Sequence, residues 1–366
     1  MHVHVIDPSA YTPPYDHALC SALAAAGLQT TLYTSHFAYG PVPDADGYKR
    51  LEFFYRAAGG APASRVRRLA KLAQHVPDML RYRRAAAGAD IVHFQWLTVP
   101  HLDSRLLPSG RPLVFTAHDV LPREPRPGQI AAHRRLLDRF DAVIVHSEHG
   151  RTRLVEELSV DPERVHVIPH GAFAHLAARE GQPLPAELCN TEVPVCLCFG
   201  LMRPYKGIDV LLEAWSGIEG AELWVAGMPR MDTSALRAAA PPGVRFIERF
   251  IGDDELGAYF RRADLLVLPY REIDQSGVLA TALGFGKAML LSDVGGFGEV
   301  AAAGAARLVP AGEAPALHDA LAELLTDGSE RQRLAAAASA LATGPCSWSA
   351  VAERTRALYE ELQLRR

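Results

Sequence analysis

The sequence lacks a hydrophobic segment long enough to cross a bilayer, since no apolar run approaches the roughly 18 residues that a membrane-spanning helix needs. It also lacks a charged leader: the chain opens on a strand-like run over residues 1–7, so we expect a cytoplasmic protein. The formal net charge of −4 gives no general attraction to nucleic acid. We therefore expect neither an integral membrane protein nor a nucleic-acid partner.

Cysteine is scarce as well, and its spacing matches no zinc motif. The five cysteines are Cys20, Cys189, Cys196, Cys198 and Cys346. Cys196 and Cys198 alternate within a strand-like run, which directs both side chains to the same side, into a core. We therefore expect reduced, buried thiols rather than disulfides or metal ligands.

Two further patterns are missing. No G-x-G-x-x-G run follows the first strand-like segment, which argues against a dinucleotide-dependent oxidoreductase. Several histidines stand near expected strand ends, but we predict no metal ligand among them. These histidines are His93, His146, His149 and His170.

What the sequence does contain is a regular alternation of short apolar runs with helical patterns, which is typical of parallel sheets with helices on both faces. The strands predicted for the first half are 2–6, 29–34, 91–95, 113–117, 142–146 and 165–168. The strands predicted for the second half are 195–200, 222–226, 244–247, 265–269, 288–292 and 306–309. The predicted fold class is therefore α/β, with two doubly wound parallel sheets.

Residues 174–192 interrupt this rhythm with Gly181, Pro183 and Pro185, so we place a domain linker there. We predict an N-terminal domain over 1–175, a C-terminal domain over 190–345 and a closing helix within 346–366. Ligands of such sheets bind beyond the carboxyl ends of the strands, and two facing domains would place those ends in a cleft.

The strongest local signal runs from Phe199 to Gly207, after a predicted strand and before a predicted helix. Gly200 frees the backbone where the strand ends, and Arg203 and Lys206 supply two positive charges to the turn. With the amides of the following helix, these charges are suited to neutralising a diphosphate. The alternative is a solvated basic turn.

A second signal is the run Gln275-Ser276-Gly277-Val278, which follows the strand predicted to end at Pro269. Ser and Gly at the start of a helix leave backbone N–H groups that point outward and suit an anion. Simple capping by the serine is the alternative. Just before this run, Glu272 and Asp274 are placed to accept hydrogen bonds from sugar hydroxyls.

Together with further motifs, these two runs resemble glycosyltransferase family 4. The motifs are Arg203-Pro204-Tyr205-Lys206-Gly207, Gln275-Ser276-Gly277, Gly286-Lys287, Asp293-Val294-Gly295-Gly296, Phe115-Thr116-Ala117-His118-Asp119-Val120, Ile168-Pro169-His170-Gly171 and Cys346-Ser347-Trp348. The resemblance covers nearly the whole chain. It implies the GT-B fold, in which two Rossmann-like domains face each other across a cleft, and a retaining enzyme that binds its nucleotide-sugar donor on the C-terminal domain.

The resemblance also implies roles for single residues. Arg203 and Lys206 would grip the donor diphosphate beside Gly200, and His118 would lie near the transferred sugar and orient it. The amides around Ser276, Gly277 and Val278 would bind the distal phosphate, with Gln275 beside them. Phe250 and Ile251 would lie beside the base. The helix within 346–366 would cross back to the N-terminal domain.

The sequence departs from the family pattern in three places. Ile273 and Thr281 occupy the positions of a glutamate pair that many members carry; Glu272 or Asp274 would replace the first acid, and the second has no obvious replacement. Arg203 also stands later than the commonest arginine position. A glycine-rich first loop is absent, and we expect Pro13, Pro14 and Tyr15 to form a stiff loop on the acceptor side instead.

A basic stretch over residues 65–84 interleaves arginines with leucines. Such a surface is suited to anionic lipid, as a weak peripheral contact at the inner membrane face, or to a phosphorylated acceptor. The alternative that we favour from the sequence is a solvated helix pair whose leucines enter the core.

The sequence therefore predicts an enzyme that moves a hexose from a nucleotide-diphosphate sugar to the hydroxyl of a sugar- or lipid-type acceptor, with no cofactor. The base of the donor, whether UDP, GDP or dTDP, is left open. Two alternatives remain: a phosphorylase or epimerase of the same fold, and a binding protein that has lost activity.

Overall fold

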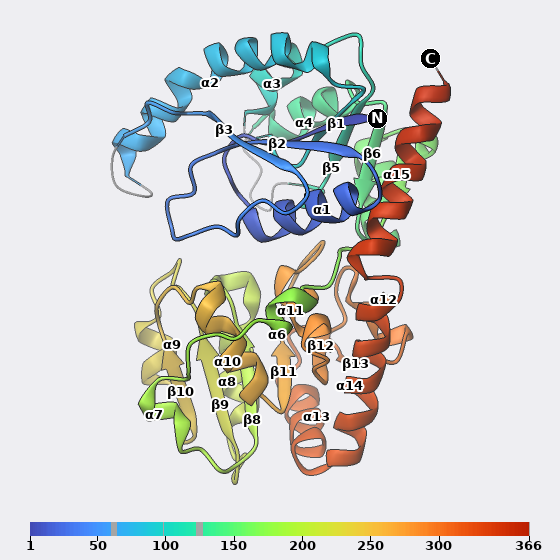
Figure 1. The fold of residues 1–366 in the computed structure, drawn as a ribbon. Coiled ribbons are helices and arrows are strands. Elements are labelled where there is room, and N and C mark those ends of the chain that lie inside the picture. Colours follow the sequence, from blue (N-terminus) through green and yellow to red (C-terminus); the bar gives the residue numbers. More distant parts are fainter. Residues whose placement is uncertain (60–63, 98, 122–126, 366) are drawn as a thin grey trace. The chain divides into compact units, whose positions relative to one another are not determined.

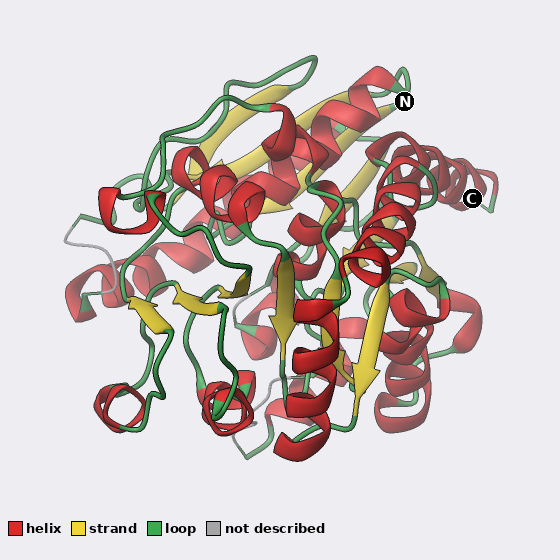
Figure 2. Cartoon of the chain, turned by 90° about the horizontal axis from the view of Figure 1, so that it is seen from below, coloured by secondary structure: helices red, strands yellow, loops and turns green. Residues whose placement is uncertain are grey.

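The computed structural model describes residues 1–59, 64–97, 99–121 and 127–365, and its contacts divide the chain into two compact units. The first unit consists of Met1–Gly171 together with Trp348–Arg366, and the second of Ala172–Ser347. Each unit holds one parallel β-sheet between helices (Figures 1 and 2), so the predicted α/β class is confirmed.

The first unit contains a seven-stranded parallel sheet in the order β3-β2-β1-β4-β5-β6-β7. Its strands are β1 (His2–Asp7), β2 (Gln29–Ser35), β3 (Lys49–Phe54), β4 (Ile91–Phe94), β5 (Leu113–Thr116), β6 (Ala142–Val145) and β7 (Val165–Val167). All except β3 were predicted within one residue or two. The order reverses between β1 and β4, which makes that junction the topological switch point of the sheet.

Helices cover both faces of this sheet. They are α1 (Pro13–Ala25), α2 (Arg65–Ala85), α3 (Pro100–Leu106), α4 (Gln129–Leu137), α5 (Glu148–Leu158) and α15 (Trp348–Leu364), with short 3₁₀ turns at η1 (Ala86–Gly88) and η2 (Pro162–Arg164). The last helix, α15, packs on α1, while α3 packs on α2 and α4. The C-terminal segment of the chain thus completes the first unit.

Two expectations for this unit are corrected. Pro13 and Pro14 do not stiffen a loop but form the first turn of α1, where a missing N–H costs nothing. The basic stretch is one helix of 21 residues, α2, rather than a helix pair. Its leucines do not enter the core: Leu69 is 68% exposed and Leu72 is 51% exposed.

The second unit contains a six-stranded parallel sheet in the order β10-β9-β8-β11-β12-β13. Its strands are β8 (Val195–Phe199), β9 (Glu222–Ala226), β10 (Val244–Ile247), β11 (Leu265–Leu268), β12 (Met289–Ser292) and β13 (Ala306–Val309). All six were predicted. Leu265–Leu268 are fully buried, as expected for a central parallel strand covered on both faces.

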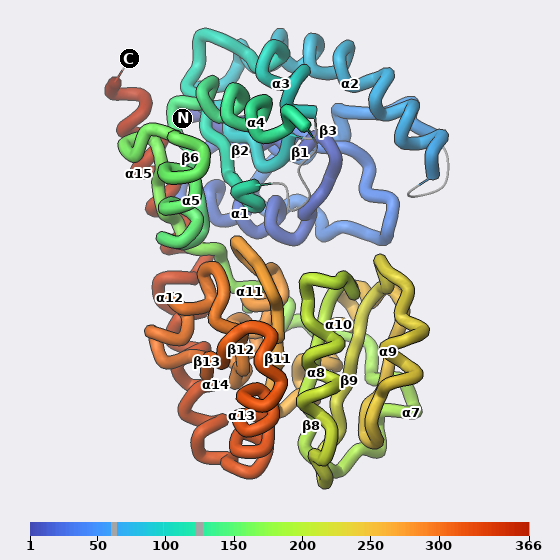
Figure 3. The backbone as a smooth tube through the Cα atoms, turned by 180° about the vertical axis from the view of Figure 1, so that it is seen from behind, coloured from blue at the N-terminus to red at the C-terminus, as the bar shows by residue number. Residues whose placement is uncertain are grey.

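The helices of the second unit are α6 (Ala174–Ala178), α7 (Ala186–Cys189), η3 (Pro204–Lys206), α8 (Ile208–Trp215), α9 (Ser234–Ala238), α10 (Asp253–Arg262), α11 (Gly277–Gly284), α12 (Phe297–Ala302), α13 (Ala314–Thr326) and α14 (Gly328–Thr343). Helix α8 packs with α9 and α13, and α11 packs with α6 and α14 (Figure 3). Residues 174–192, where we predicted the linker, lie inside this unit and form α6 and α7.

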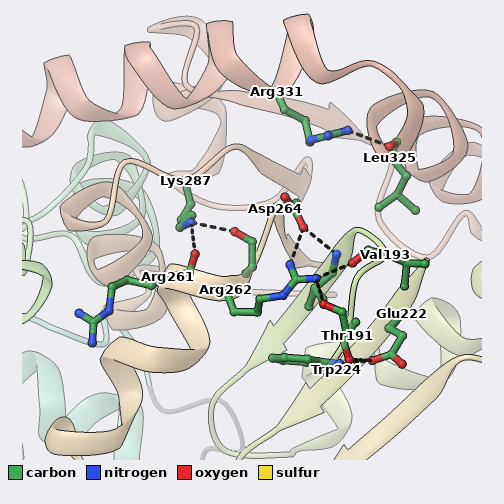
Figure 4. Close-up of polar contacts among 12 residues, drawn as sticks. Thr191, Val193, Glu222, Trp224, Arg261, Arg262, Asp264, Lys287, Leu325 and Arg331 are labelled. Atoms are coloured by element: carbon green, nitrogen blue, oxygen red, sulfur yellow. Dashed lines mark hydrogen bonds and ion pairs between the residues drawn. The ribbon is translucent and has the colours of Figure 1, made fainter. Parts of the chain in front are cut away.

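Polar contacts tie the segments that precede β8 and β11 (Figure 4). Arg262 donates to the carbonyls of Thr191 and Val193 and pairs with Asp264 at 2.9 Å. Lys287, from a motif noted in the sequence, donates to the carbonyls of Arg261 and Ala263 at the end of α10. Lys287 therefore caps a helix. These contacts lie at the amino ends of the strands and leave the carboxyl edge to other residues.

Among the described residues, no helix combines the length and the apolar composition that crossing a membrane would require. None of the five cysteines, all of which lie in the described part of the chain, forms a disulfide; Cys20, Cys196 and Cys198 are buried as expected, whereas Cys189 is exposed.

Candidate active site

The candidate site of the second unit lies where the strand order reverses, between β8 and β11. These two strands pair with each other, and the chain proceeds from them in opposite directions across the sheet. The loops that follow them therefore border the crevice in which sheets of this type bind ligands. The loop after β8 carries Gly200, Arg203 and Lys206, and the loop after β11 leads to Ser276 and α11.

Glycines bring these two loops into contact. A Cβ atom on Gly200 would lie 3.3 Å from Nζ of Lys206 and 3.1 Å from Cγ2 of Val278. Gly207 has φ +64°, and a Cβ atom there would lie 2.0 Å from the carbonyl oxygen of Pro269. Only glycine fits this close approach. The structure therefore brings together Gly200, Lys206 and Val278, all of which were predicted to bind the donor.

Lys206 holds its charge between the loops. It is only 7% exposed; its Nζ donates to the hydroxyl of Tyr270 and lies 4.2 Å from the centre of that ring. A cation over an aromatic face is attracted to it, so the ring and hydroxyl fix the position of the ammonium group. Tyr270, which directly follows β11 and Pro269, was not recognised from the sequence as part of the site.

Arg203 contrasts with Lys206. Its side chain is exposed, and it makes no hydrogen bond or ion pair with any residue that the structure describes. Its guanidinium is therefore available to a ligand as a planar donor of several hydrogen bonds.

The amino end of α11 offers backbone donors. The hydroxyl of Ser276 accepts from the amide of Leu279 at 3.3 Å, and the carbonyl of Ser276 accepts from Ala280. Within the described part of the chain, the amides of Gly277 and Val278 make no hydrogen bond, and nothing lies within 4 Å of a Cβ atom placed on Gly277. Two free amides at a helix start with open space before them suit an anion.

The remaining predicted residues of this unit differ in exposure. Phe250, after β10, is 45% exposed, whereas Ile251 and Ile273 are buried. Glu272 is exposed. Thr281 is buried, and its hydroxyl donates to the carbonyl of Gly277 at 2.9 Å, within α11.

Asp274 and Gln275 lie in the segment that leads into α11; Asp274 is buried, and Gln275 is half-buried. The paired glycines after β12 position this same segment. Gly295 has φ +55°, and a Cβ atom on it would lie 1.8 Å from the carbonyl oxygen of Ile273. This third glycine motif therefore supports the loop after β11.

The first unit presents aromatic rings at its own switch point, between β1 and β4. Trp96 follows β4, donates to the hydroxyl of Thr12 at 3.0 Å and packs on Tyr11 with ring centres 4.4 Å apart. It also stacks on His118, with ring centres 4.9 Å apart and an interplanar angle of 11°. Trp96 was missed in the sequence, because an aromatic residue after a strand gains meaning only once the strand order is known.

His118 is buried beneath this surface, with 2% of its area exposed. Its Nε2 lies 3.1 Å from Oε1 of Gln95, and its Nδ1 lies 3.4 Å from Nε2 of His146. Tyr15 packs edge-on against the His118 ring and is itself buried. Of the acceptor-side residues that we predicted, Tyr15 therefore belongs to the packing around His118.

The histidines of this cluster are held neutral. Burial, followed by the neighbouring histidine charges, lowers the pKa of His118. Burial lowers the pKa of His93 to about 3, that of His146 to about 4 and that of His170 to about 3. Among the described residues, no group of three or more His, Cys, Asp or Glu side chains is arranged to hold a metal ion.

Two protein-family models match consecutive parts of the chain. The model described as Glycosyltransferase Family 4 matches residues 15–172, and that described as Glycosyl transferases group 1 matches residues 193–327. The chain belongs to glycosyltransferase family 4. The family and the enzyme class predicted from the motifs are thereby confirmed.

Two curated relatives of this chain carry different enzyme names and match it over different lengths. GDP-mannose:glycolipid 4-beta-D-mannosyltransferase of Xanthomonas campestris pv. campestris is 27% identical over 50% of this chain and 50% of the relative. D-inositol 3-phosphate glycosyltransferase of Corynebacterium efficiens is 27% identical over 76% of this chain and 73% of the relative. The match thus spans about half the length of the first of these relatives.

A solved structure covers the whole glycosyltransferase chain. Anabaena HepE in complex with UDP-glucose has a TM-score of 0.78 and 17% identity, and the match covers 99% of this chain and 100% of that one. At this identity the likeness shows the fold alone, which is the predicted GT-B fold.

Proposed function

We propose that this glycosyltransferase transfers a hexose from a nucleotide-diphosphate sugar to an acceptor hydroxyl, with retention of configuration at the anomeric carbon. The observation that carries the proposal is the combination, at one switch point, of the cations of Arg203 and Lys206 with the free amides of Gly277 and Val278. Two cations and two amides suit a pyrophosphate, whose charge is too large for amides alone.

This arrangement lowers the barrier through electrostatics. As the glycosidic bond breaks, negative charge grows on the leaving diphosphate. Lys206 is already fixed by Tyr270, and the amides are fixed by α11, so little reorganisation accompanies the reaction. Arg203 closes on the ligand from the exposed side. No metal ion enters this scheme.

Retention is proposed through a front-face route, in which the acceptor attacks from the side of the leaving group and the departing phosphate takes the acceptor proton. In the second unit the acids next to the predicted sugar position are Glu272, which is exposed, and Asp274, which is buried. We assign both to sugar hydroxyls rather than to nucleophilic attack. Phe250, which is exposed, is proposed to stack on the base, and Ile251 to support it.

His118 is proposed to orient the transferred sugar through Trp96. The neutral ring is covered by Trp96, which stacks on it and is itself half-buried. Fixing the indole fixes the ring on which a sugar can stack. His118→Ala is expected to lower kcat more than it raises the KM for the donor.

The experiment that tests the proposal is a product assay with UDP-, GDP- and dTDP-hexoses and a panel of sugar and lipid acceptors. We expect one donor to release its nucleoside diphosphate only when an acceptor is present, and NMR to show the donor's anomeric configuration in the product. An inverted product would disprove retention. Dependence on inorganic phosphate would identify a phosphorylase, conversion of the donor alone an epimerase, and binding without turnover a non-catalytic protein.

We also propose a cytoplasmic location with weak peripheral contact to the inner membrane face through α2. Val66, Leu69 and Leu72 are each more than half exposed on this helix, and Arg65, Arg68, Arg83 and Arg84 are exposed with them. An exposed apolar stripe with flanking arginines suits an anionic lipid surface. Leu69→Ser should reduce co-sedimentation with anionic vesicles; sedimentation equal to that of the wild type would remove this contact.

A further inference from the structure

Two adjoining cavities lie beyond the carboxyl ends of β1, β2 and β3 in the first unit. The smaller has a volume of about 190 Å³ and the larger about 490 Å³. His36, Arg67 and Lys71 line both, so the cavities meet at these side chains. They lie at the edge of the sheet where ligands of parallel sheets bind.

The smaller cavity is cationic. Arg67, Arg68 and Lys71 line it, and no carboxylate is found among its described lining residues. Arg67 and Lys71 are four residues apart on α2 and so share one face of the helix. Ser64, whose hydroxyl caps the start of α2, lines the same cavity, so the positive end of the helix dipole adds to these charges.

The positive charges of Arg67 and Lys71 repel each other, because the two side chains are close together and partly buried. Lys71 is half-buried and lies 5.1 Å from the centre of the Tyr55 ring. Burial and the charge of Arg67 lower the pKa of Lys71. Arg68 pairs with no acid among the described residues. Neighbouring cations that are partly removed from water become more stable when an anion lies between them.

The larger cavity offers acceptors of hydrogen bonds instead. Glu52 lines it and lies 3.2 Å from Nδ1 of His36. Ser35 lines it as well; this residue is 4% exposed, and its hydroxyl has no hydrogen-bond partner among the described residues. A buried hydroxyl without a partner is costly, and a ligand hydroxyl that reaches it would remove that cost.

We propose that these cavities bind a phosphorylated polyol as the acceptor, with the phosphate among Arg67, Arg68 and Lys71 and hydroxyls directed to Ser35 and Glu52. The inference rests on the proposed function, because it names the acceptor class of that reaction. Of these two cavities Glu52 lines the larger and not the smaller, which keeps its carboxylate away from the phosphate. A soluble sugar phosphate and a phosphorylated lipid headgroup share this chemistry.

The test uses the intact protein without donor. Glucose 6-phosphate, glucose and inorganic phosphate are titrated by calorimetry, and vesicles of phosphatidylinositol or of phosphatidylserine, which is also anionic but lacks the polyol, are compared by co-sedimentation. We expect glucose 6-phosphate or phosphatidylinositol vesicles to bind, and Lys71→Ala to weaken that binding about tenfold or more, as loss of a charge-assisted hydrogen bond does. Binding of glucose 6-phosphate identifies the soluble source, and stronger binding of phosphatidylinositol than of phosphatidylserine vesicles identifies the lipid source. Equal binding of both vesicles without binding of glucose 6-phosphate would reflect only the general contact of α2 with anionic lipid and would overturn the inference.

Arg134→Ala is the matched control, since it removes the same charge from an exposed position on α4 of the same unit, lines neither cavity and does not belong to the surface of α2 proposed to contact lipid. It should bind like the wild type. If Lys71→Ala fails to fold by circular dichroism, Arg68→Ala serves in its place. The inference is overturned if glucose binds as well as glucose 6-phosphate, if no probe binds, or if Arg134→Ala loses as much affinity as Lys71→Ala.

Donor binding separates this inference from the proposed function. If nucleoside diphosphates bind the protein and no phosphorylated probe does, the acceptor class is wrong and the proposed transfer stands. If a phosphorylated probe binds and no nucleoside diphosphate does, the proposed transfer fails although the phosphate site is real.

Discussion

At the scale of single residues, the site depends on where glycine allows two loops to touch. The strand-turn-helix run from Phe199 to Gly207 was recognisable in the sequence because Gly, Arg and Lys stand at a strand end. The partner of Lys206 was not, since Tyr270 lies on a different strand and only the pairing of β8 with β11 brings the two together.

Gly207→Ala should destabilise the protein by more than the cost of a positive φ alone. A Cβ atom at Gly207 would meet the carbonyl of Pro269 at 2.0 Å, so the loop must also move. Gly217→Ala is the matched control, because Gly217 has φ +85° but nothing within 4 Å of the added atom. By urea denaturation we expect about 1 kcal/mol for the control and about 3 kcal/mol or more for Gly207→Ala. Equal losses would mean that the contact with Pro269 is not tight.

At the scale of elements, sequence periodicity predicted nearly every strand but did not settle which apolar faces are covered. β3 was missed because this edge strand, Lys49–Phe54, carries three charged residues and is only partly buried. On α2, leucines at helical spacing predicted a core, yet Met79 and Tyr82 face inward while Leu69 and Leu72 face solvent. When a helix carries apolar residues on two sides, the elements packed against it determine which side is buried.

Helix α11 depends on Ser276, the residue that caps its start. Ser276→Ala removes the oxygen that accepts from the amide of Leu279, and we expect a loss of about 1 kcal/mol in the free energy of unfolding. Ser276→Gly should cost only a few tenths of a kcal/mol, because glycine leaves the amide open to water. The two variants are compared by chemical denaturation. A larger loss for glycine than for alanine would contradict a capping role.

At the scale of the whole molecule, the neutral histidine cluster makes stability depend on pH. The pKa values of His93, His146 and His170 lie below the unfolded value of about 6.5, so the unfolded chain binds more protons between pH 6.5 and about 3 to 4. Their stabilisation is complete above pH 6.5 and is lost as the pH falls. Each histidine contributes up to about 1.4 kcal/mol per pH unit.

His146→Asn isolates this effect, because asparagine can still donate to the carbonyl of Ile168 but does not titrate. The melting temperature of the wild type should fall more between pH 7.5 and pH 5.5, which are the two values to compare, than that of the variant. The comparison is needed because the buried pair Asp7 and Asp16 has raised pKa values and acts with the opposite sign. An equal fall in both proteins would show that His146 takes up protons equally in the folded and unfolded states, so that folding does not lower its pKa.

The two units differ in how many of their site residues could be predicted from the sequence. In the second unit, Gly200, Lys206 and Val278 were predicted from local motifs, and the structure brings them together. In the first unit the residues at the carboxyl edge come from separate strands and from α2, so Trp96 and the cavities beside Arg67 and Lys71 appear only when the strand order is known.

The most direct test of the account is calorimetric titration of nucleoside diphosphates into the wild type, Arg203→Ala, Lys206→Ala and the control Arg237→Ala, whose exposed side chain pairs with Glu248 instead. We predict that at least one diphosphate binds the wild type and the control equally, and that each of the other two variants loses roughly tenfold or more in affinity. If no diphosphate binds the wild type, or if Arg203→Ala and Lys206→Ala bind it as the control does, the crevice between β8 and β11 is not a pyrophosphate site.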